Sequence, residues 1–154
     1  VEPLAEALSR LGAESALVVH GSDGMDELTT TGPSAIARVS GGKIECQTLD
    51  PATLGLPRAS LTDLAGGDAA ANAQTTRSIL SGETGPRRDI VLLNAAAALW
   101  VVGRASSLKE GLALAAKSLD EGAATQKLEA LTEATRRAGI KFDQQSTADA
   151  GVSG

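Results

Sequence analysis

The residues of this chain that could do chemistry gather in one glycine-rich stretch, VVHGSDGMDELTTTG, from Val18 to Gly32. It places Asp23, Asp26 and Glu27 just after an apolar run. Two neighbouring ionised carboxylates repel each other by about 1 kcal/mol in water and by several times more near a protein surface. Mg²⁺ relieves such repulsion, because it binds carboxylate oxygens and keeps waters that bridge to phosphates. The glycines and the three threonines leave room for a polyanion, but the same pattern also fits an exposed acidic turn without a ligand.

Three further features have a chemical and a structural interpretation. His20 could act as a general acid or contact a substrate, or it could be a hydrogen-bonded residue at a strand end. The stretch Gly66 to Asp68 could cradle an anion at a helix start, although a turn capped by the Asp68 carboxylate explains it better. Arg87 and Arg88 could bind phosphate or be solvated at the start of a helix. The chain contains no GxSxG, CxxC, HExxH or P-loop motif.

Composition limits the class of protein. The 154 residues suffice for one domain, and its core must use small side chains, because Trp100 and Phe142 are the only aromatic residues. A net charge of −5 argues against binding to nucleic acid. The apolar run Ile90–Val102 is shorter than the about 20 residues that a membrane-spanning helix needs. Cys46 is the single cysteine, so an intramolecular disulfide is excluded and the cytoplasm is the expected compartment.

The acidic stretch is expected to follow a strand. Residues 1–12 have the apolar spacing of a short amphipathic helix. The four consecutive apolar residues 16–19 are typical of a strand that is buried on both faces of a parallel sheet. Residues 34–40 and 43–49 are β-prone and flank two glycines, which predicts a hairpin. We therefore expect an α/β fold with a mixed, mainly parallel sheet covered by helices.

The second half of the chain is expected to be helical. Helices are predicted over residues 68–82, 87–102, 107–122 and 123–138, and the second of them, being apolar almost all round, should lie at the centre. Ser107 and Glu110 have the spacing of a capping box. The polar composition after residue 138 predicts a mobile tail. The expected organisation is one domain over residues 1–138 and a mobile polar tail over residues 139–154.

Three segments resemble the anthranilate phosphoribosyltransferase family. The stretch VVHGSDGMDELTTTGPS is similar to the family signature VHGxDGxDE, and the likeness continues through TLDPATLGLPRASLTDLAGGDAAANA and GPRRDIVLLNAAAALWVVG. It extends from Val1 to about Ala134. The resemblance implies the carboxyl-terminal portion of the α/β domain of the class II nucleoside phosphorylase and phosphoribosyltransferase fold.

The resemblance also implies an activity and a metal site. Members of the family transfer a phosphoribosyl group from phosphoribosyl pyrophosphate to anthranilate and release pyrophosphate, an early step of tryptophan biosynthesis. The acidic pair of the signature falls on Asp26 and Glu27, which implies that these two residues hold Mg²⁺ against the pyrophosphate. Asp23 would lie at most behind them, and Met25 stands where the family often has Leu. No catalytic residue is assigned, and the substrate-binding residues are unknown.

The resemblance further implies that the chain is about half of an enzyme. In the family, a glycine-rich phosphate loop, a Lys-His-Gly-Asn motif, a serine that shares the metal and an arginine that contacts anthranilate all lie upstream of the matched region. The helical domain that forms the homodimer lies there too. We therefore expect the isolated chain to be inactive. A pyrimidine nucleoside phosphorylase-like relative and a non-catalytic α/β module remain as alternatives.

Overall fold

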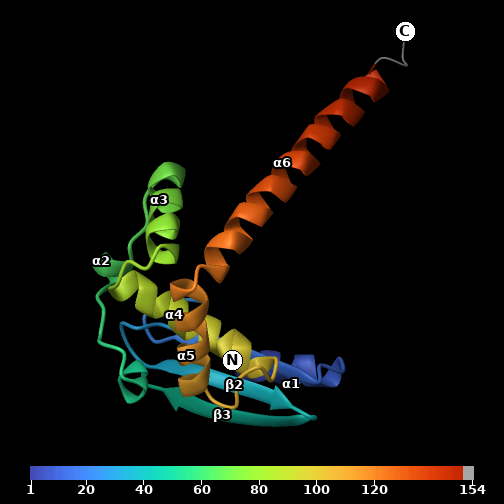
Figure 1. The fold of residues 1–154 in the computed structure, drawn as a ribbon. Coiled ribbons are helices and arrows are strands. Elements are labelled where there is room, and N and C mark those ends of the chain that lie inside the picture. Colours follow the sequence, from blue (N-terminus) through green and yellow to red (C-terminus); the bar gives the residue numbers. More distant parts are fainter. Residues whose placement is uncertain (151–154) are drawn as a thin grey trace.

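The computed structural model describes the backbone of residues 1–150 and the side chains of residues 1–139. Helices and strands follow the chain in a simple order (Figure 1). The amino-terminal elements are α1 (Glu2–Arg10), β1 (Ser15–Gly21), β2 (Ser34–Ser40) and β3 (Lys43–Leu49). A 3₁₀-helix, η1 (Pro51–Leu54), and the single-turn helix α2 (Leu61–Leu64) follow. The helical half comprises α3 (Ala69–Leu80), α4 (Pro86–Val101), α5 (Leu108–Asp120) and α6 (Ala123–Ala150).

The sheet within the described residues has three strands in the order β1-β2-β3, and both pairs are antiparallel. The prediction of a mainly parallel sheet is therefore wrong here. A run of apolar residues indicates burial but not strand direction, which depends on the partner strand. The loop between β1 and β2 contains no crossover helix, so it reverses the chain and brings Ser34 opposite Gly21. The four apolar residues 16–19 of β1 are also only partly buried, rather than buried on both faces.

Two helices cover the two faces of this sheet. Alternate residues of β2 point to opposite faces, so Ile36 faces α4 whereas Ala37 and Val39 face α1. The core on the α1 side is small and centres on Ala5, Ala37 and Val39. The core on the α4 side is larger, and its buried members are Leu28, Ile36, Leu93, Ala96, Ala97 and Leu108. The acidic stretch therefore enters the larger core through Leu28.

Helix α4 lies at the centre of the molecule, as predicted. It packs against the sheet on one side and against α5 on the other, where Leu92, Ala115 and Leu119 form a third apolar cluster. The exposed fraction of Val91 is 40%, so α4 is not buried all round. No helix in the described part of the chain is long and apolar enough to cross a membrane.

Local signals in the sequence correspond to the observed ends of elements. Gly41 and Gly42 both have positive φ in the β2–β3 turn, as the predicted hairpin requires. Asp68 caps α3 by accepting a hydrogen bond from the N–H of Ala71. Ser107 caps α5 by accepting one from the N–H of Glu110. These contacts confirm the predicted starts of both helices.

The predicted end of the last helix was too early. Helix α6 runs past Ala138 to Ala150 and leads away from α5 (Figure 1). The predicted tail therefore includes helical backbone, and its last residues, 151–154, lie outside the described residues. Mobility of residues 139–154, and the division of the chain at residue 138, stay predictions.

Candidate functional site

The acidic stretch forms the loop from Ser22 to Pro33 that connects β1 to β2. A tight turn starts it: the N–H of Gly24 donates to the carbonyl of Gly21 at 3.0 Å, and the N–H of Gly21 donates to the carbonyl of Met25 at 2.9 Å. Gly24 has a φ of +94°, which side-chain-bearing residues rarely adopt. A Cβ on Gly21 would lie 2.5 Å from Oδ1 of Asp23. The two glycines thus allow the loop to fold back on the end of β1.

Asp23 is the acidic residue that organises this loop. Its Oδ2 accepts hydrogen bonds of 2.6 Å from the hydroxyls of both Thr29 and Thr31, and its Oδ1 accepts one of 3.1 Å from the N–H of Met25. Burial raises the pKa of the Asp23 carboxyl, but these hydrogen bonds outweigh burial and leave the pKa below its ordinary value. Asp23 is therefore ionised at neutral pH, and both of its carboxylate oxygens accept hydrogen bonds from within the loop.

The three threonines are buried or partly buried and do not line an open space. Thr29 and Thr30 are fully buried, and the hydroxyls of Thr29 and Thr31 are committed to Asp23. The N–H of Thr29 donates to the hydroxyl of Ser34 at 3.1 Å. The expectation that these side chains leave room for a polyanion is therefore wrong, because their polar atoms build the loop itself. The Thr30 hydroxyl is buried without a partner among the described residues.

Asp26 and Glu27, by contrast, are both exposed. Among the described side chains, neither makes an ion pair or a side-chain hydrogen bond. Partial desolvation, together with the charges of Asp26 and Asp23, raises the pKa of the Glu27 carboxyl. The two predicted metal ligands are thus accessible, and their negative charge has no cationic partner among the described side chains.

Asn94 on α4 binds the loop backbone directly after the pair Asp26 and Glu27. Sequence reasoning missed this contact. Its Oδ1 accepts a 3.0 Å hydrogen bond from the N–H of Leu28, and its Nδ2 donates to the carbonyl of Leu28 at 2.8 Å. Nδ2 also donates to the carbonyl of Ile90 at 3.0 Å. The sequence did contain a signal for it: Asn94 is a lone amide in the apolar run Ile90–Val102. A polar group that becomes buried needs hydrogen-bond partners.

The remaining candidate residues lie outside the loop from Ser22 to Pro33. His20 is exposed, and its side chain makes no hydrogen bond within the described part of the chain. Asp68 caps a helix, so the capped-turn interpretation holds. Arg87 donates to the carbonyls of Asp63 and Ala65, so it is not simply solvated. Arg88 is buried at 9% exposure and pairs with Asp120 at 2.7 Å, so it is not solvated either.

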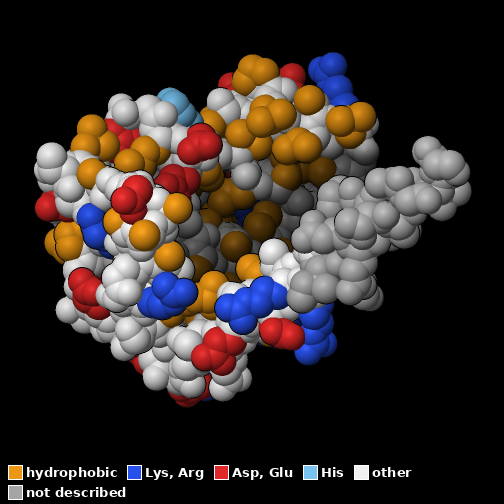
Figure 2. Space-filling view, turned by 90° about the horizontal axis from the view of Figure 1, so that it is seen from above, with side chains coloured by type: hydrophobic (Ala, Val, Ile, Leu, Met, Phe, Trp, Pro, Cys, Tyr) orange, Lys and Arg blue, Asp and Glu red, His pale blue; other side chains and the backbone are white. Residues whose placement is uncertain are grey.

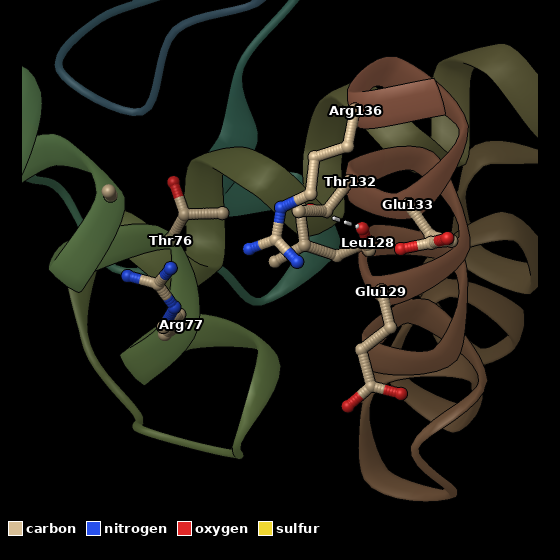
Figure 3. A pocket seen from close by; sticks show the side chains of 8 residues that line it. Thr76, Arg77, Leu128, Glu129, Thr132, Glu133 and Arg136 are labelled. Carbon is tan, nitrogen blue, oxygen red and sulfur yellow. Dashed lines mark hydrogen bonds between the residues drawn. The ribbon is translucent and has the colours of Figure 1, made fainter. Parts of the chain in front are cut away.

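The helices, rather than the acidic loop, line the hollows of the described residues, two of which show their character. One, of about 540 Å³, lies between α3 and α6, where Arg77 and Arg136 share the space with Glu129 and Glu133 (Figure 3). Charges of both signs are balanced there, so this hollow favours neither anions nor cations. The other, of about 700 Å³, is apolar and runs along α4 and α5. From above, the molecule is hollowed, with hydrophobic side chains on the floor and charged side chains along part of the rim (Figure 2).

The donor set of the acidic loop suits Mg²⁺ but is incomplete within this chain. The described residues contain no group of three or more His, Cys, Asp or Glu side chains that could hold a metal ion. Mg²⁺ is usually bound through one or two carboxylates, with waters and substrate phosphates as its other ligands. Two unpaired, exposed carboxylates fit that requirement.

Comparison with known proteins gives a consistent result. Residues 1–125 match the family described as "Glycosyl transferase family, a/b domain". The anthranilate phosphoribosyltransferase of Parvibaculum lavamentivorans is 61% identical over 135 residues, which are 88% of this chain but 40% of that protein. The chain thus spans about 40% of the length of the curated relatives that it matches.

Solved structures show the same likeness. The crystal structure of the anthranilate phosphoribosyltransferase of Thermus thermophilus superposes with a TM-score of 0.75 at 45% identity, covering 83% of this chain and 37% of that one. A variant of the Saccharomyces cerevisiae enzyme, solved with Mg bound, gives a TM-score of 0.74 at 25% identity, covering 83% of this chain and 38% of that one. The described residues therefore have the fold of part of an α/β domain.

Proposed function

This chain belongs to the glycosyl transferase family through its a/b domain, and from that premise we propose that it is the carboxyl-terminal part of an anthranilate phosphoribosyltransferase. The complete enzyme would transfer a phosphoribosyl group from phosphoribosyl pyrophosphate to the amine of anthranilate and release pyrophosphate. The observation that carries the proposal is the accessible, uncompensated pair Asp26 and Glu27 on a loop that the fold anchors on both sides. The identity of 61% with a named relative supports the choice of substrates.

We assign Asp26 and Glu27 the role of magnesium ligands. Both side chains are exposed and make no ion pair among the described residues. Partial desolvation, and after it the charges of Asp26 and Asp23, raise the pKa of Glu27, and a divalent ion would neutralise part of that charge. When bound, magnesium would stabilise the charge that develops on the departing pyrophosphate. Asp23 does not join them, because its two oxygens are used by the threonines and by Met25.

We propose that the residues for the other steps of the reaction lie in a part of the enzyme that this chain does not include. We assign no described residue to general acid or base catalysis, to anthranilate or to the ribosyl group. We accordingly expect the chain to be inactive by itself and to act within a longer protein, as a homodimer. Homodimer formation and the cytoplasmic location remain predictions.

The alternatives differ in what the completed protein would do. A pyrimidine nucleoside phosphorylase-like enzyme would cleave a pyrimidine nucleoside with inorganic phosphate, and a non-catalytic module would do neither reaction. The names of the relatives favour the transferase. Assays with anthranilate and phosphoribosyl pyrophosphate, and in parallel with thymidine and phosphate, separate the three possibilities.

The assignment can be tested in a completed enzyme, made by joining the amino-terminal part of the Parvibaculum lavamentivorans relative to this chain. Asp26→Asn combined with Glu27→Gln should lower turnover by orders of magnitude, because the charges that hold the metal are removed. Both side chains are exposed, so the free energy of unfolding should change by no more than about 0.5 kcal/mol. Steady-state kinetics and urea denaturation measure the two effects.

A matched control removes the same charge elsewhere. Glu14→Gln combined with Glu45→Gln also replaces two exposed carboxylates, and neither lies in the acidic loop. This control should retain turnover close to that of the unmodified enzyme. Normal turnover in the Asp26 and Glu27 double variant would overturn the metal assignment.

A further inference from the structure

We propose that Asn94 is a positioning residue, which holds the backbone beside Glu27 so that Asp26 and Glu27 can bind one divalent ion together. The inference rests on the proposed function of these two carboxylates. It assigns a role to the central helix, because Asn94 reaches the loop from α4.

The contact between Asn94 and the loop is specific in its geometry. The side-chain amide meets both backbone groups of Leu28, accepting from its N–H at 3.0 Å and donating to its carbonyl at 2.8 Å. The second N–H of the amide donates to the carbonyl of Ile90 one turn earlier in α4, at 3.0 Å. That bond fixes the orientation of the amide. Leu28 itself is fully buried in the core under the sheet, so its backbone is held from both sides.

The contact demands the amide of an asparagine. An amide supplies an acceptor and two donors, which match one N–H and two carbonyls. A leucine of similar shape would leave both backbone groups of Leu28 without these partners. A glutamine keeps the same polar groups but carries them on a longer stem, so they cannot occupy the same positions. Shape and polarity are thus both required at this site.

The hydrogen bonds between Asn94 and Leu28 restrain the loop next to the acidic pair. Asp23 anchors the loop before the acidic pair, through its bonds to Thr29 and Thr31, and Asn94 anchors it directly after Glu27. Between these anchors, Asp26 and Glu27 make no side-chain hydrogen bond among the described residues. Two repelling carboxylates relieve their repulsion by moving apart unless the backbone restrains them. Metal ligands held in place by a supporting contact bind more tightly than ligands that must be brought together.

The test measures metal binding directly, apart from catalysis. In the completed enzyme, with Mn²⁺ alone as the probe, electron paramagnetic resonance gives the dissociation constant of the ion. Asn94→Leu and Asn94→Gln should each weaken Mn²⁺ binding by about 10- to 100-fold, the range typical of lost supporting contacts at metal sites. Amide hydrogen exchange should show faster exchange at Leu28 in both variants, while the amides of α4 keep their protection.

The control is Leu92→Ala. Leu92 is buried on the same helix, two positions from Asn94, but packs in the separate cluster toward α5. Its variant should lose thermal stability at least as much as Asn94→Leu and retain the Mn²⁺ affinity of the unmodified enzyme. Equal weakening by Leu92→Ala would show that general destabilisation causes the effect and would overturn the proposal.

The variant Asp26→Asn with Glu27→Gln separates this inference from the proposed function. If that variant loses Mn²⁺ binding while Asn94→Leu and Asn94→Gln bind within twofold of the unmodified enzyme, the positioning role is wrong and the metal assignment stands. If that variant retains Mn²⁺ binding, the metal assignment fails, and the role of Asn94 fails with it. Loss of binding in all three variants, with the control unaffected, supports both.

Discussion

The three acidic side chains of the loop have different tasks although they lie within five consecutive residues. Asp23 is internal: its carboxylate accepts bonds from two hydroxyls and one backbone N–H. Asp26 and Glu27 are exposed and have no side-chain partner among the described residues. The hydrogen bonds lower the pKa of Asp23, whereas desolvation and neighbouring charge raise that of Glu27. A carboxylate that organises the loop and carboxylates that we propose as metal ligands thus differ in what surrounds them.

The lowered pKa of Asp23 predicts how loop stability depends on pH. A carboxyl whose pKa is lower in the folded than in the unfolded state stabilises the fold above its unfolded value, near 3.8, and loses that effect as pH falls through the folded value. Asp23→Asn should therefore be less stable than the unmodified protein at neutral pH. The difference should shrink as the pH falls below about 3.8.

Urea denaturation of both proteins between pH 7 and pH 2.5 gives the two stability curves. The other carboxylates of the chain are the same in both proteins, so the difference between the curves reports Asp23 together with the effect of its charge on the pKa of Glu27. A difference that stays constant over this range would show that the hydrogen bonds to Asp23 do not depend on its charge.

At the scale of elements, α4 connects every other part of the site. It covers the sheet, carries Asn94 to the loop and packs against α5. Near its carboxyl end, the guanidinium of Arg38 on β2 lies 4.4 Å from the centre of the Trp100 ring, a cation–π contact with the sheet. The carbonyl of Val101 accepts a 2.7 Å hydrogen bond from the Ser15 hydroxyl. The carboxyl-terminal half of the helix is therefore fastened to the sheet.

The approach of α5 to α4 depends on Gly111. A Cβ at this position would lie 2.7 Å from the carbonyl oxygen of Ala96 and 2.9 Å from its Cα. Alanine favours a helix over glycine by about 1 kcal/mol, but the overlap with backbone costs about 1–3 kcal/mol or more. Gly111→Ala should therefore lower the free energy of unfolding, by about 2 kcal/mol or more where the backbone cannot move, as measured by urea denaturation.

Gly139 provides the matched control for this substitution. It lies within α6, and a Cβ there would meet no atom within 4 Å. Gly139→Ala should be neutral or raise the free energy of unfolding by up to about 1 kcal/mol. If Gly111→Ala were as stable as Gly139→Ala, the two helices would not be held as closely as the structure shows.

At the scale of the whole molecule, burial is distributed unevenly. Helix α4 contributes five buried residues, whereas α3 has none and stands at the periphery (Figure 1). Local unfolding is easiest where few side chains are buried. The apolar hollow along α4 and α5 likewise leaves Val91 and Leu114 exposed at 40% and 38%. The site loop, through Leu28 and Asn94, belongs to the well-packed part.

Amide hydrogen exchange should reflect this distribution. We expect the amides in the middle of α3 to exchange orders of magnitude faster than those of residues 92–97 in α4, because opening α3 exposes little apolar surface. Mass spectrometry of peptides from the two helices measures the rates. Equal protection of both helices would mean that α3 is covered in solution by something that the described residues do not include.

Much of this architecture was predictable from local sequence. The helix spacing of residues 1–12, the glycine pair at Gly41 and Gly42, and the caps at Asp68 and Ser107 all predicted elements that the structure contains. Such signals are reliable because they act within a few residues: a cap, a turn or an apolar face depends mainly on its own neighbours. The acidic signature also identified Asp26 and Glu27 as the candidate pair, and the structure shows that both are accessible.

The tertiary structure alone decided the features that depend on residues far apart in the chain. The antiparallel direction of β1 depends on which strand pairs with it, which its apolar residues do not encode. The internal role of the threonines depends on how the loop folds back onto Asp23. The clamp between Asn94 and Leu28 joins residues that are 66 positions apart. The sequence by itself thus determined most of the helices and strands and pointed to a candidate pair of carboxylates. Three-dimensional packing decided how the loop with that pair is held, because only folding brings distant hydrogen-bonding groups within reach.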